Sequence, residues 1–188
     1  SANSLDDKAE MDIHPSSKNI SFPEASIEDI NKAANVLKSA NHPIILVGDR
    51  VSQYDAVTEV VNLAETIGAE VYGHTSTQVN FPTNHPQYLG KLPWSSVRNN
   101  ETINKLNKAD VILAVGCPVF SDYFFIPKTP INIKTSLIHI DINRNEIGKI
   151  ENTKLGIHAA PKSTIRSIQK NISKNISGEE LESAKFRK

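Results

Sequence analysis

Two apolar runs of strand length place the strongest constraint on the fold of this chain. Residues 43–50 read PIILVGDR and residues 110–116 read DVILAVG, so each run is almost continuously apolar up to a glycine. A strand with one face in water alternates polar and apolar residues, whereas a strand covered on both faces is apolar throughout. Both runs therefore predict central strands of a parallel sheet with helices packed on its two faces.

Helical patterns lie on either side of the first run. Ser26 is a suitable N-cap for a helix whose apolar residues recur at helical spacing as far as Leu37, and NHP at 41–43 ends that helix. A second helix is predicted to begin at Ser52, to bury one apolar face, and to end at Gly68.

The remaining elements complete the pattern of an α/β domain. Further strands are predicted in three segments: AEVYG (69–73), TSLIHIDI (135–142) and LGIHAA (155–160). Further helices are predicted near 100–107, from about Asn143, and from Pro161. A long loop lies between the strand at 69–73 and the helix near 100–107, and it contains Pro82, Pro86 and Pro93. Strands that alternate with helices predict a doubly wound parallel sheet.

Length and composition predict one domain with flanking segments. The chain has 188 residues, of which 38% are apolar, which suits a single globular domain. We expect a linker or tail over 1–25, the domain over 26–174, and an exposed charged tail or linker over 175–188. Because the chain opens with Ser1 and not with methionine, we expect a piece of a longer protein or a cloning remnant.

Charge and cysteine content exclude several classes of function. With 21 basic and 21 acidic residues the formal net charge is zero, so we predict neither a nucleic-acid nor a membrane partner. No apolar stretch approaches the roughly 20 residues of a membrane span, and no signal-peptide pattern opens the chain, so we predict a cytoplasmic protein. The single Cys117 excludes an internal disulfide, and six scattered histidines argue against a metal site.

Candidate binding residues follow two of the predicted strands, because ligands approach parallel sheets at the carboxyl ends of the strands. Gly48, Asp49 and Arg50 form the turn after the first strand, where helix-terminal amides can hold phosphate. The G-x-G-x-x-G fingerprint is absent, and Arg50 stands where a second glycine would admit pyrophosphate, so a plain tight turn is the alternative. Asp141 either accepts hydrogen bonds from a ribose or caps the helix predicted at Asn143.

The loop after the second apolar run is the other candidate site. Phe120, Tyr123 and Phe124 belong to this loop, where they either line a crevice or cap the end of the sheet. Cys117 has no visible neighbouring base, so a small buried residue is the simpler interpretation. His74 and His85 lie at or after a strand end and stay functional candidates. His139 and His158 lie inside strand patterns and are interpreted as structural.

Five segments of the chain resemble the central domain of thiamine-diphosphate-dependent 2-oxo-acid enzymes, in order and in spacing. They are HPIILVGDRV, AETIGAEVYG, FPTNHPQYLG, ADVILAVGCPVF and LIHIDINRNEIGK. The resemblance covers about residues 26–172. It is closest to the benzoylformate decarboxylase family, where FPT.HP and G.PVF also occur, and then to acetolactate synthase. It implies a Rossmann-like sheet.

The resemblance also implies that this chain is the middle part of a larger enzyme. In the family, thiamine diphosphate binds between a pyrimidine domain, which supplies a glutamate, and a diphosphate domain, whose Gly-Asp-Gly motif and later asparagine hold Mg²⁺. Neither domain is in this sequence. The chain alone is therefore expected to hold no catalytic residue, cofactor or metal. Its expected partners are the two missing domains, a 2-oxo-acid substrate in the parent, and further copies in a homo-oligomer.

The same family places a histidine for proton transfer in the segment after PVF. Ungapped alignment from Phe120 puts Tyr123 at that position. A phenol with a pKa of about 10 donates a hydrogen bond but is a poorer proton shuttle near neutrality than imidazole. The identity of the 2-oxo acid, and the choice between decarboxylation and carboligation, stay open.

Two alternatives remain at this point. Some relatives, acetolactate synthase among them, hold FAD or ADP on this domain, although Arg50 and the lack of a glycine-rich segment after YLGKLPWSS argue against FAD here. A free-standing domain of related fold that acts on NAD is the other alternative.

Overall fold

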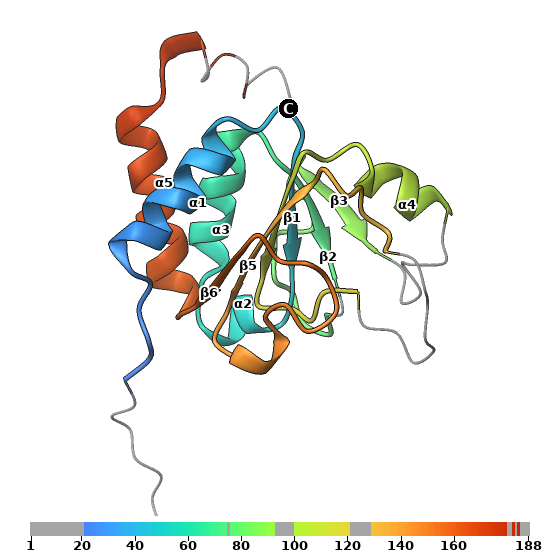
Figure 1. The fold of residues 1–188 in the computed structure, drawn as a ribbon, viewed down its shortest axis with the longest axis horizontal. Coiled ribbons are helices and arrows are strands. Elements are labelled where there is room, and N and C mark those ends of the chain that lie inside the picture. Colours follow the sequence, from blue (N-terminus) through green and yellow to red (C-terminus); the bar gives the residue numbers. More distant parts are fainter. Residues whose placement is uncertain are drawn as a thin grey trace, which may run out of the picture.

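The computed structural model describes residues 21–74, 76–92, 100–120 and 129–179, together with Glu182 and Ala184. Within these residues six strands form one parallel sheet in the order β3-β2-β1-β4-β5-β6 (Figure 1). They are β1 (Pro43–Val47), β2 (Glu70–Gly73), β3 (Tyr88–Lys91), β4 (Val111–Val115), β5 (Ser136–Asp141) and β6 (Leu155–His158). The two apolar runs are the central strands β1 and β4. The predicted α/β fold with a parallel sheet is therefore confirmed.

Helices cover both faces of the sheet (Figure 1). On one face α1 (Ile27–Lys38), α3 (Val57–Ile67) and α5 (Pro161–Asn175) pack together, and α4 (Asn100–Leu106) lies on the other. Two short elements, α2 (Arg50–Gln53) and the 3-10 turn η3 (Arg144–Glu146), follow β1 and β5. The predicted helix ends are present: the Ser26 hydroxyl accepts a hydrogen bond from the Asp29 N–H at 3.0 Å, and Gly68 ends α3 with a φ of 64°.

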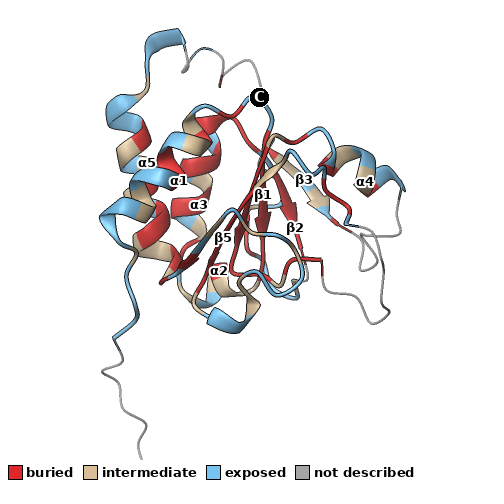
Figure 2. Cartoon of the chain, viewed as in Figure 1, coloured by how far each residue is buried: buried red, intermediate tan, exposed pale blue. Residues whose placement is uncertain are grey.

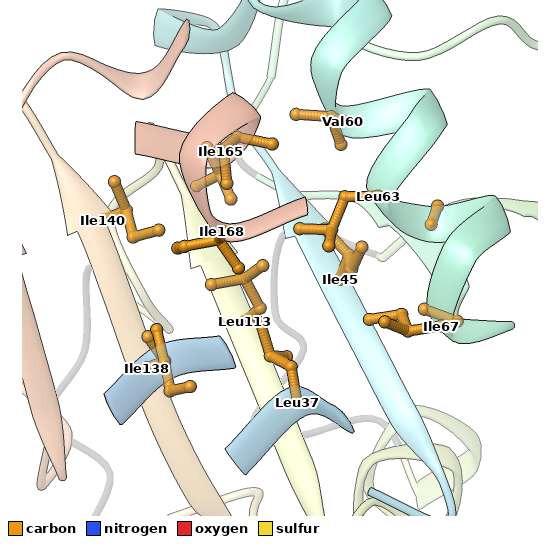
Figure 3. Packing of buried hydrophobic residues seen from close by; sticks show 14 of the residues in the cluster. Leu37, Ile45, Val60, Leu63, Ile67, Leu113, Ile138, Ile140, Ile165 and Ile168 are labelled. Carbon is orange, nitrogen blue, oxygen red and sulfur yellow. The ribbon is translucent and has the colours of Figure 1, made fainter. Parts of the chain in front are cut away.

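Aliphatic side chains fill the layer between the sheet and the three helices (Figure 3). Ile45, Leu113 and Ile138 extend from β1, β4 and β5, and Leu63 and Ile168 meet them from α3 and α5. All five are at most 1% exposed. Fully burying one such side chain stabilises the folded state by about 1.5–3 kcal/mol. Burial of this layer is therefore the main source of the stability that holds the helices on the sheet.

A smaller core covers the opposite face of the sheet. Leu46, Ile112 and Leu137 contribute to it from the strands, Leu106 from α4, and residues 117–120 complete it beyond the end of β4. Every residue of β1 and β4 is buried, as Figure 2 shows for β1. This burial confirms the prediction that the two apolar strands are covered on both faces.

Two predicted helices differ from the structure. The helix expected from Ser52 is divided into α2 and α3, because Asp55 adopts a left-handed backbone with a φ of 52°. The resulting turn lets the Ala56 N–H donate to the Val51 carbonyl oxygen at 2.8 Å and buries both residues in the core. The helix expected from Asn143 is only the η3 turn.

The chain extends after η3 because it returns to cover β6. Ile147 is extended, and its Cγ2 lies 2.5 Å from the position that a Cβ on Gly156 would occupy. The structure also places a strand, β3, inside the segment predicted as a long loop. Tyr88 pairs with Val71 of β2, and β3 is an edge strand in which no residue is fully buried.

Segments predicted to flank the domain contact it. The Phe22 ring packs edge-on against Tyr54 at a centroid distance of 5.1 Å, and the Pro23 carbonyl oxygen accepts a hydrogen bond from the Ala160 N–H at 2.9 Å. Ala184, in the segment predicted as an exposed tail, is only 3% exposed, and its carbonyl oxygen lies close to Gly68. The boundaries at 25 and 175 stay predictions.

The ends of β1 and β4 meet without any side chain between their backbones. The Gly48 N–H donates to the Val115 carbonyl oxygen at 3.0 Å. A Cβ on Gly48 would lie 2.4 Å from the Cys117 Cβ and 2.5 Å from the Gly116 carbonyl oxygen. Gly116 itself has a φ of 62°, and a Cβ there would lie 2.9 Å from the Arg50 Cβ. Both glycines are required by this contact.

We predict that Gly48→Ala lowers the free energy of unfolding by about 3 kcal/mol, because the new methyl group overlaps backbone atoms that cannot move independently of the sheet. Urea denaturation at neutral pH measures the change. Gly178→Ala is the matched control, since no atom of the described residues lies within 4 Å of a Cβ at that position. A Gly48→Ala variant as stable as the control would contradict the tight contact.

Candidate functional site

The candidate site lies at the carboxyl ends of the strands. Three of its segments lie at the ends of neighbouring strands: 48–50 after β1, 116–120 after β4, and 141–143, which begins with the last residue of β5. A fourth, 76–80, lies beyond the end of β2. Strand order reverses between β1 and β4, and this reversal point is where open α/β sheets bind ligands.

Asp49 is fully occupied by the loop after β2. Its carboxylate accepts hydrogen bonds from the Thr77 N–H at 2.9 Å, the Thr77 hydroxyl at 2.7 Å, the Gln78 N–H at 2.8 Å and the Asn80 side-chain amide at 3.0 Å. Burial opposes ionisation of Asp49, but these hydrogen bonds outweigh it and lower its pKa to about 2. Asp49 is therefore a charged anchor for residues 77–80.

Arg50 is equally occupied by Asp141. The Arg50 Nε and Nη2 donate to the two oxygens of the Asp141 carboxylate, each at 2.7 Å. The Asp141 side chain is 0% exposed, and it also accepts a hydrogen bond from the Asn143 N–H at 2.7 Å. Burial would raise the pKa of Asp141, but the His139 ring, the Arg50 guanidinium and the Asn143 N–H hold it below its usual range. The pair links the ends of β1 and β5 across β4.

His139 holds the first residue of the loop after β4. Its Nε2 lies 3.0 Å from the Cys117 carbonyl oxygen. A carbonyl only accepts, so this nitrogen carries the proton. The Cys117 thiol is buried against the Leu46 carbonyl oxygen, and burial raises its pKa to about 12. A thiol in this state is not a nucleophile at neutral pH. The structure thus agrees with the interpretation of both side chains as structural.

His74 holds the last described residue of the same loop. The Phe120 N–H donates to the His74 Nε2 at 3.0 Å, and the two rings lie at a centroid distance of 5.2 Å. Phe120 has a φ of 51°, a left-handed conformation that is uncommon for a residue with a side chain. His74 is only 3% exposed, and burial lowers its pKa to about 4. It is therefore neutral at physiological pH.

A hollow of about 730 Å³ lies away from the reversal point, between Phe22, Tyr54 and the start of α5. Its two cations are already paired within the chain: Lys162 with Asp55, and Arg166 with Glu59. Each cation therefore already has a carboxylate partner within the chain.

The structure brings together four of the seven predicted site residues, but in structural contacts: Gly48, Asp49, Arg50 and Asp141. Phe120 packs under His74, and Tyr123 and Phe124 lie outside the described residues.

Among the described residues, no group of three or more His, Cys, Asp or Glu side chains is arranged to hold a metal ion. In that same part of the chain, no helix is long and apolar enough to cross a membrane.

Sequence reasoning identified His74 by its position at a strand end but not its role. Its partner Phe120 is 46 residues further along the chain. His85, the other histidine of that group, is half-buried, with its Nε2 at 3.3 Å from a Glu65 carboxylate oxygen. His158, the last residue of β6, has its Nε2 3.0 Å from the carbonyl oxygen of Ile142, which directly follows β5.

The family described as thiamine pyrophosphate enzyme, central domain, matches residues 30–168. The sulfoacetaldehyde acetyltransferase of Rhodobacter capsulatus is 29% identical over 160 residues, covering 82% of this chain and 26% of that protein. The acetolactate synthase large subunit of Buchnera aphidicola is 30% identical over 152 residues, covering 78% of this chain and 25% of that protein.

A solved structure gives the same result. The thiamine diphosphate-dependent 4-hydroxybenzoylformate decarboxylase of Rhodococcus jostii RHA1 superposes with a TM-score of 0.72 at 25% identity, covering 87% of this chain and 30% of that one. The chain spans about a quarter of the length of the curated relatives that it matches.

The strand order and the helices on both faces define a Rossmann-like α/β domain. The chain belongs to the central-domain family of thiamine pyrophosphate enzymes. This membership confirms the resemblance found in the five sequence segments.

We predict that His74 makes the stability of the chain depend on pH between about 6.5 and 4. The unfolded chain binds a proton at this histidine below a pKa of about 6.5, whereas the folded chain resists protonation down to about 4. The free energy of unfolding should therefore fall as the pH falls through this window, by about 3 kcal/mol at most. Urea denaturation at pH 7, 5.5 and 4 measures it. A His74→Gln variant should lack this component, and equal slopes for the two proteins would refute it.

Proposed function

We propose that this chain is the central, non-catalytic domain of a thiamine-diphosphate-dependent 2-oxo-acid decarboxylase or carboligase of the benzoylformate decarboxylase kind. The domain spans 26–174, and the segments 1–25 and 175–188 serve as linkers. Its contributions are an assembly surface for a homo-oligomer and a substrate-pocket loop with Phe120, Tyr123 and Phe124. Family membership supports this proposal, as does a length of about a quarter of the relatives.

The closed reversal point between β1 and β4 is the observation that carries the proposal. The Gly48 backbone touches residues 116–117, and Arg50 is held by a buried carboxylate. A pyrophosphate would need free amides and space for its oxygens at this place. The strand ends of this domain instead hold its own loops, which is the property of a structural domain rather than of a nucleotide-binding one.

The same geometry opposes both alternative functions. An FAD or ADP module and a free-standing NAD-dependent domain each require a nucleotide against the carboxyl ends of the strands. Asp141, the candidate for a ribose contact, is 0% exposed and bonded to Arg50 through both oxygens. These residues do not fit a dinucleotide.

In the proposed parent enzyme the chemistry comes from the cofactor and from the other domains. Thiamine diphosphate, held through Mg²⁺, supplies the electron sink for loss of carbon dioxide from a 2-oxo acid. The role of this chain in the parent enzyme is to border the substrate pocket. Tyr123 is proposed to donate a hydrogen bond there, because a phenol with a pKa of about 10 keeps its proton at neutral pH.

Sequencing the encoding gene beyond both ends of the chain tests the proposal. A reading frame that continues into a Gly-Asp-Gly motif, with an asparagine about 25 residues later, would supply the site for Mg²⁺ and diphosphate. A frame that starts near Ser1 and stops near Lys188 would overturn the proposal and leave a domain that works alone.

We predict that the isolated chain binds neither thiamine diphosphate with Mg²⁺ nor FAD, ADP or NAD. Calorimetric titration with each compound should give no saturable heat, because the reversal point is closed by the chain itself. The purified chain should also lack flavin absorbance near 450 nm, a rough property of the chromophore. Saturable binding of any nucleotide would show that the contact at Gly48 opens, and would favour the nucleotide-binding alternative.

We predict that Tyr123→Phe in the full-length enzyme lowers kcat/KM for its 2-oxo acid about tenfold, the effect of losing one hydrogen bond of about 1.4 kcal/mol. Steady-state kinetics measure it. Tyr54→Phe is the control, because Tyr54 packs against Phe22 beside α2 and is no part of the proposed pocket loop. Unchanged turnover and substrate preference in Tyr123→Phe would place this residue outside the pocket.

A further inference from the structure

We propose that His74 and His139 are positioning residues that hold the base of the pocket loop from opposite sides, with His74 fixing Phe120 and His139 fixing Cys117. This inference rests on the proposed function, since it assigns a role to the loop after β4. It concerns two buried side chains that act through the backbone of residues 117–120.

The two attachments come from strands on opposite sides of β4. His139 belongs to β5, which pairs directly with β4, and its Nε2 lies 3.0 Å from the Cys117 carbonyl oxygen. His74 follows β2, which is separated from β4 by β1, and its Nε2 accepts the Phe120 N–H at 3.0 Å. The segment 117–120 therefore crosses the end of β1, with one histidine at each end.

The conformation of Phe120 makes the second attachment necessary. A left-handed backbone costs a residue with a side chain on the order of 1 kcal/mol. Phe120 is only 3% exposed, so its N–H is removed from water, and within the part of the chain that the structure describes the His74 nitrogen is the acceptor that satisfies it. The ring of His74 also lies against the ring of Phe120 at 5.2 Å. One side chain thus satisfies the amide and packs against the residue.

The two histidines need opposite tautomers. His74 accepts through Nε2, so its proton is on Nδ1, whereas His139 donates through Nε2. Among the described residues, the Nδ1 of each ring has no hydrogen-bond partner. A leucine or phenylalanine would fill the same space without a buried unpaired nitrogen, so packing alone does not explain either residue. The hydrogen bonds to the loop backbone explain why a histidine stands at each position.

A variant series at position 74 separates positioning from packing. Glutamine can place an oxygen near the position of Nε2 and should keep the bond to Phe120. Asparagine is polar but reaches only the position of Nδ1, and leucine removes the acceptor while keeping apolar volume. His42→Leu is the control for loss of a histidine, because His42 lies exposed at the amino end of β1.

Amide hydrogen exchange of the 188-residue chain, followed by NMR, gives the first readout. We expect the Phe120 N–H to exchange at least tenfold faster in the asparagine and leucine variants, and to keep its protection in the glutamine and His42→Leu variants. The amide of Leu113, in the middle of β4, should be unchanged throughout. Unchanged protection of Phe120 in the asparagine and leucine variants would overturn the inference, and the asparagine variant serves if the leucine variant fails to fold.

Kinetics of the full-length enzyme give the second readout. We expect His74→Asn to lower kcat/KM at least tenfold and His74→Gln to restore it. Lost protection at Phe120 together with unchanged kcat/KM would overturn the positioning role but not the proposed function. A gene that does not encode the other domains would overturn the proposed function, while the exchange experiment would still report on the attachment of Phe120 to His74.

Discussion

The backbone contact between the ends of β1 and β4 is the constraint on which the carboxyl edge of this domain depends. Gly48 has no space for a side chain, because the Cys117 Cβ and the Gly116 carbonyl oxygen lie where its Cβ would be. Gly116 in turn lies against the Arg50 Cβ. With the two loops in contact, the Arg50 guanidinium reaches Asp141 and not a ligand. The turn after β1, which could have held a phosphate, is instead filled by contacts with the loop after β4 and with Asp141.

The Arg50–Asp141 pair is a consequence of that contact and stabilises it. Burying a carboxylate is costly unless its oxygens are satisfied, and Asp141 meets this condition with two nitrogens of Arg50 and the Asn143 N–H. The pair spans β4, so it fixes β1 and β5 relative to the strand between them. Removing one partner would leave a buried charge unpaired, which is far more destabilising than loss of an exposed ion pair.

The sequence predicts the centre of this fold better than its edges, for a physical reason. β1 and β4 are covered on both faces, so burial requires apolar residues throughout, and this pattern can be recognised in the sequence. β3 pairs on one side only and has no fully buried residue, so its sequence resembles a loop. The break between α2 and α3 depends on the left-handed Asp55 and on tertiary burial of Ala56, neither of which has a local pattern.

The same distinction applies to the site. Position at a strand end singled out Gly48, Asp49 and Asp141, but their partners lie far away in the sequence. Asp49 bonds to residues 28 to 31 positions later, and Asp141 to a residue 91 positions earlier. A strand-end carboxylate that binds a ribose and one that binds its own chain look alike until the fold assembles them. The stability of the domain comes from its two apolar cores. The polar groups at the strand ends, including the two buried histidines, instead determine where the backbone of each loop begins.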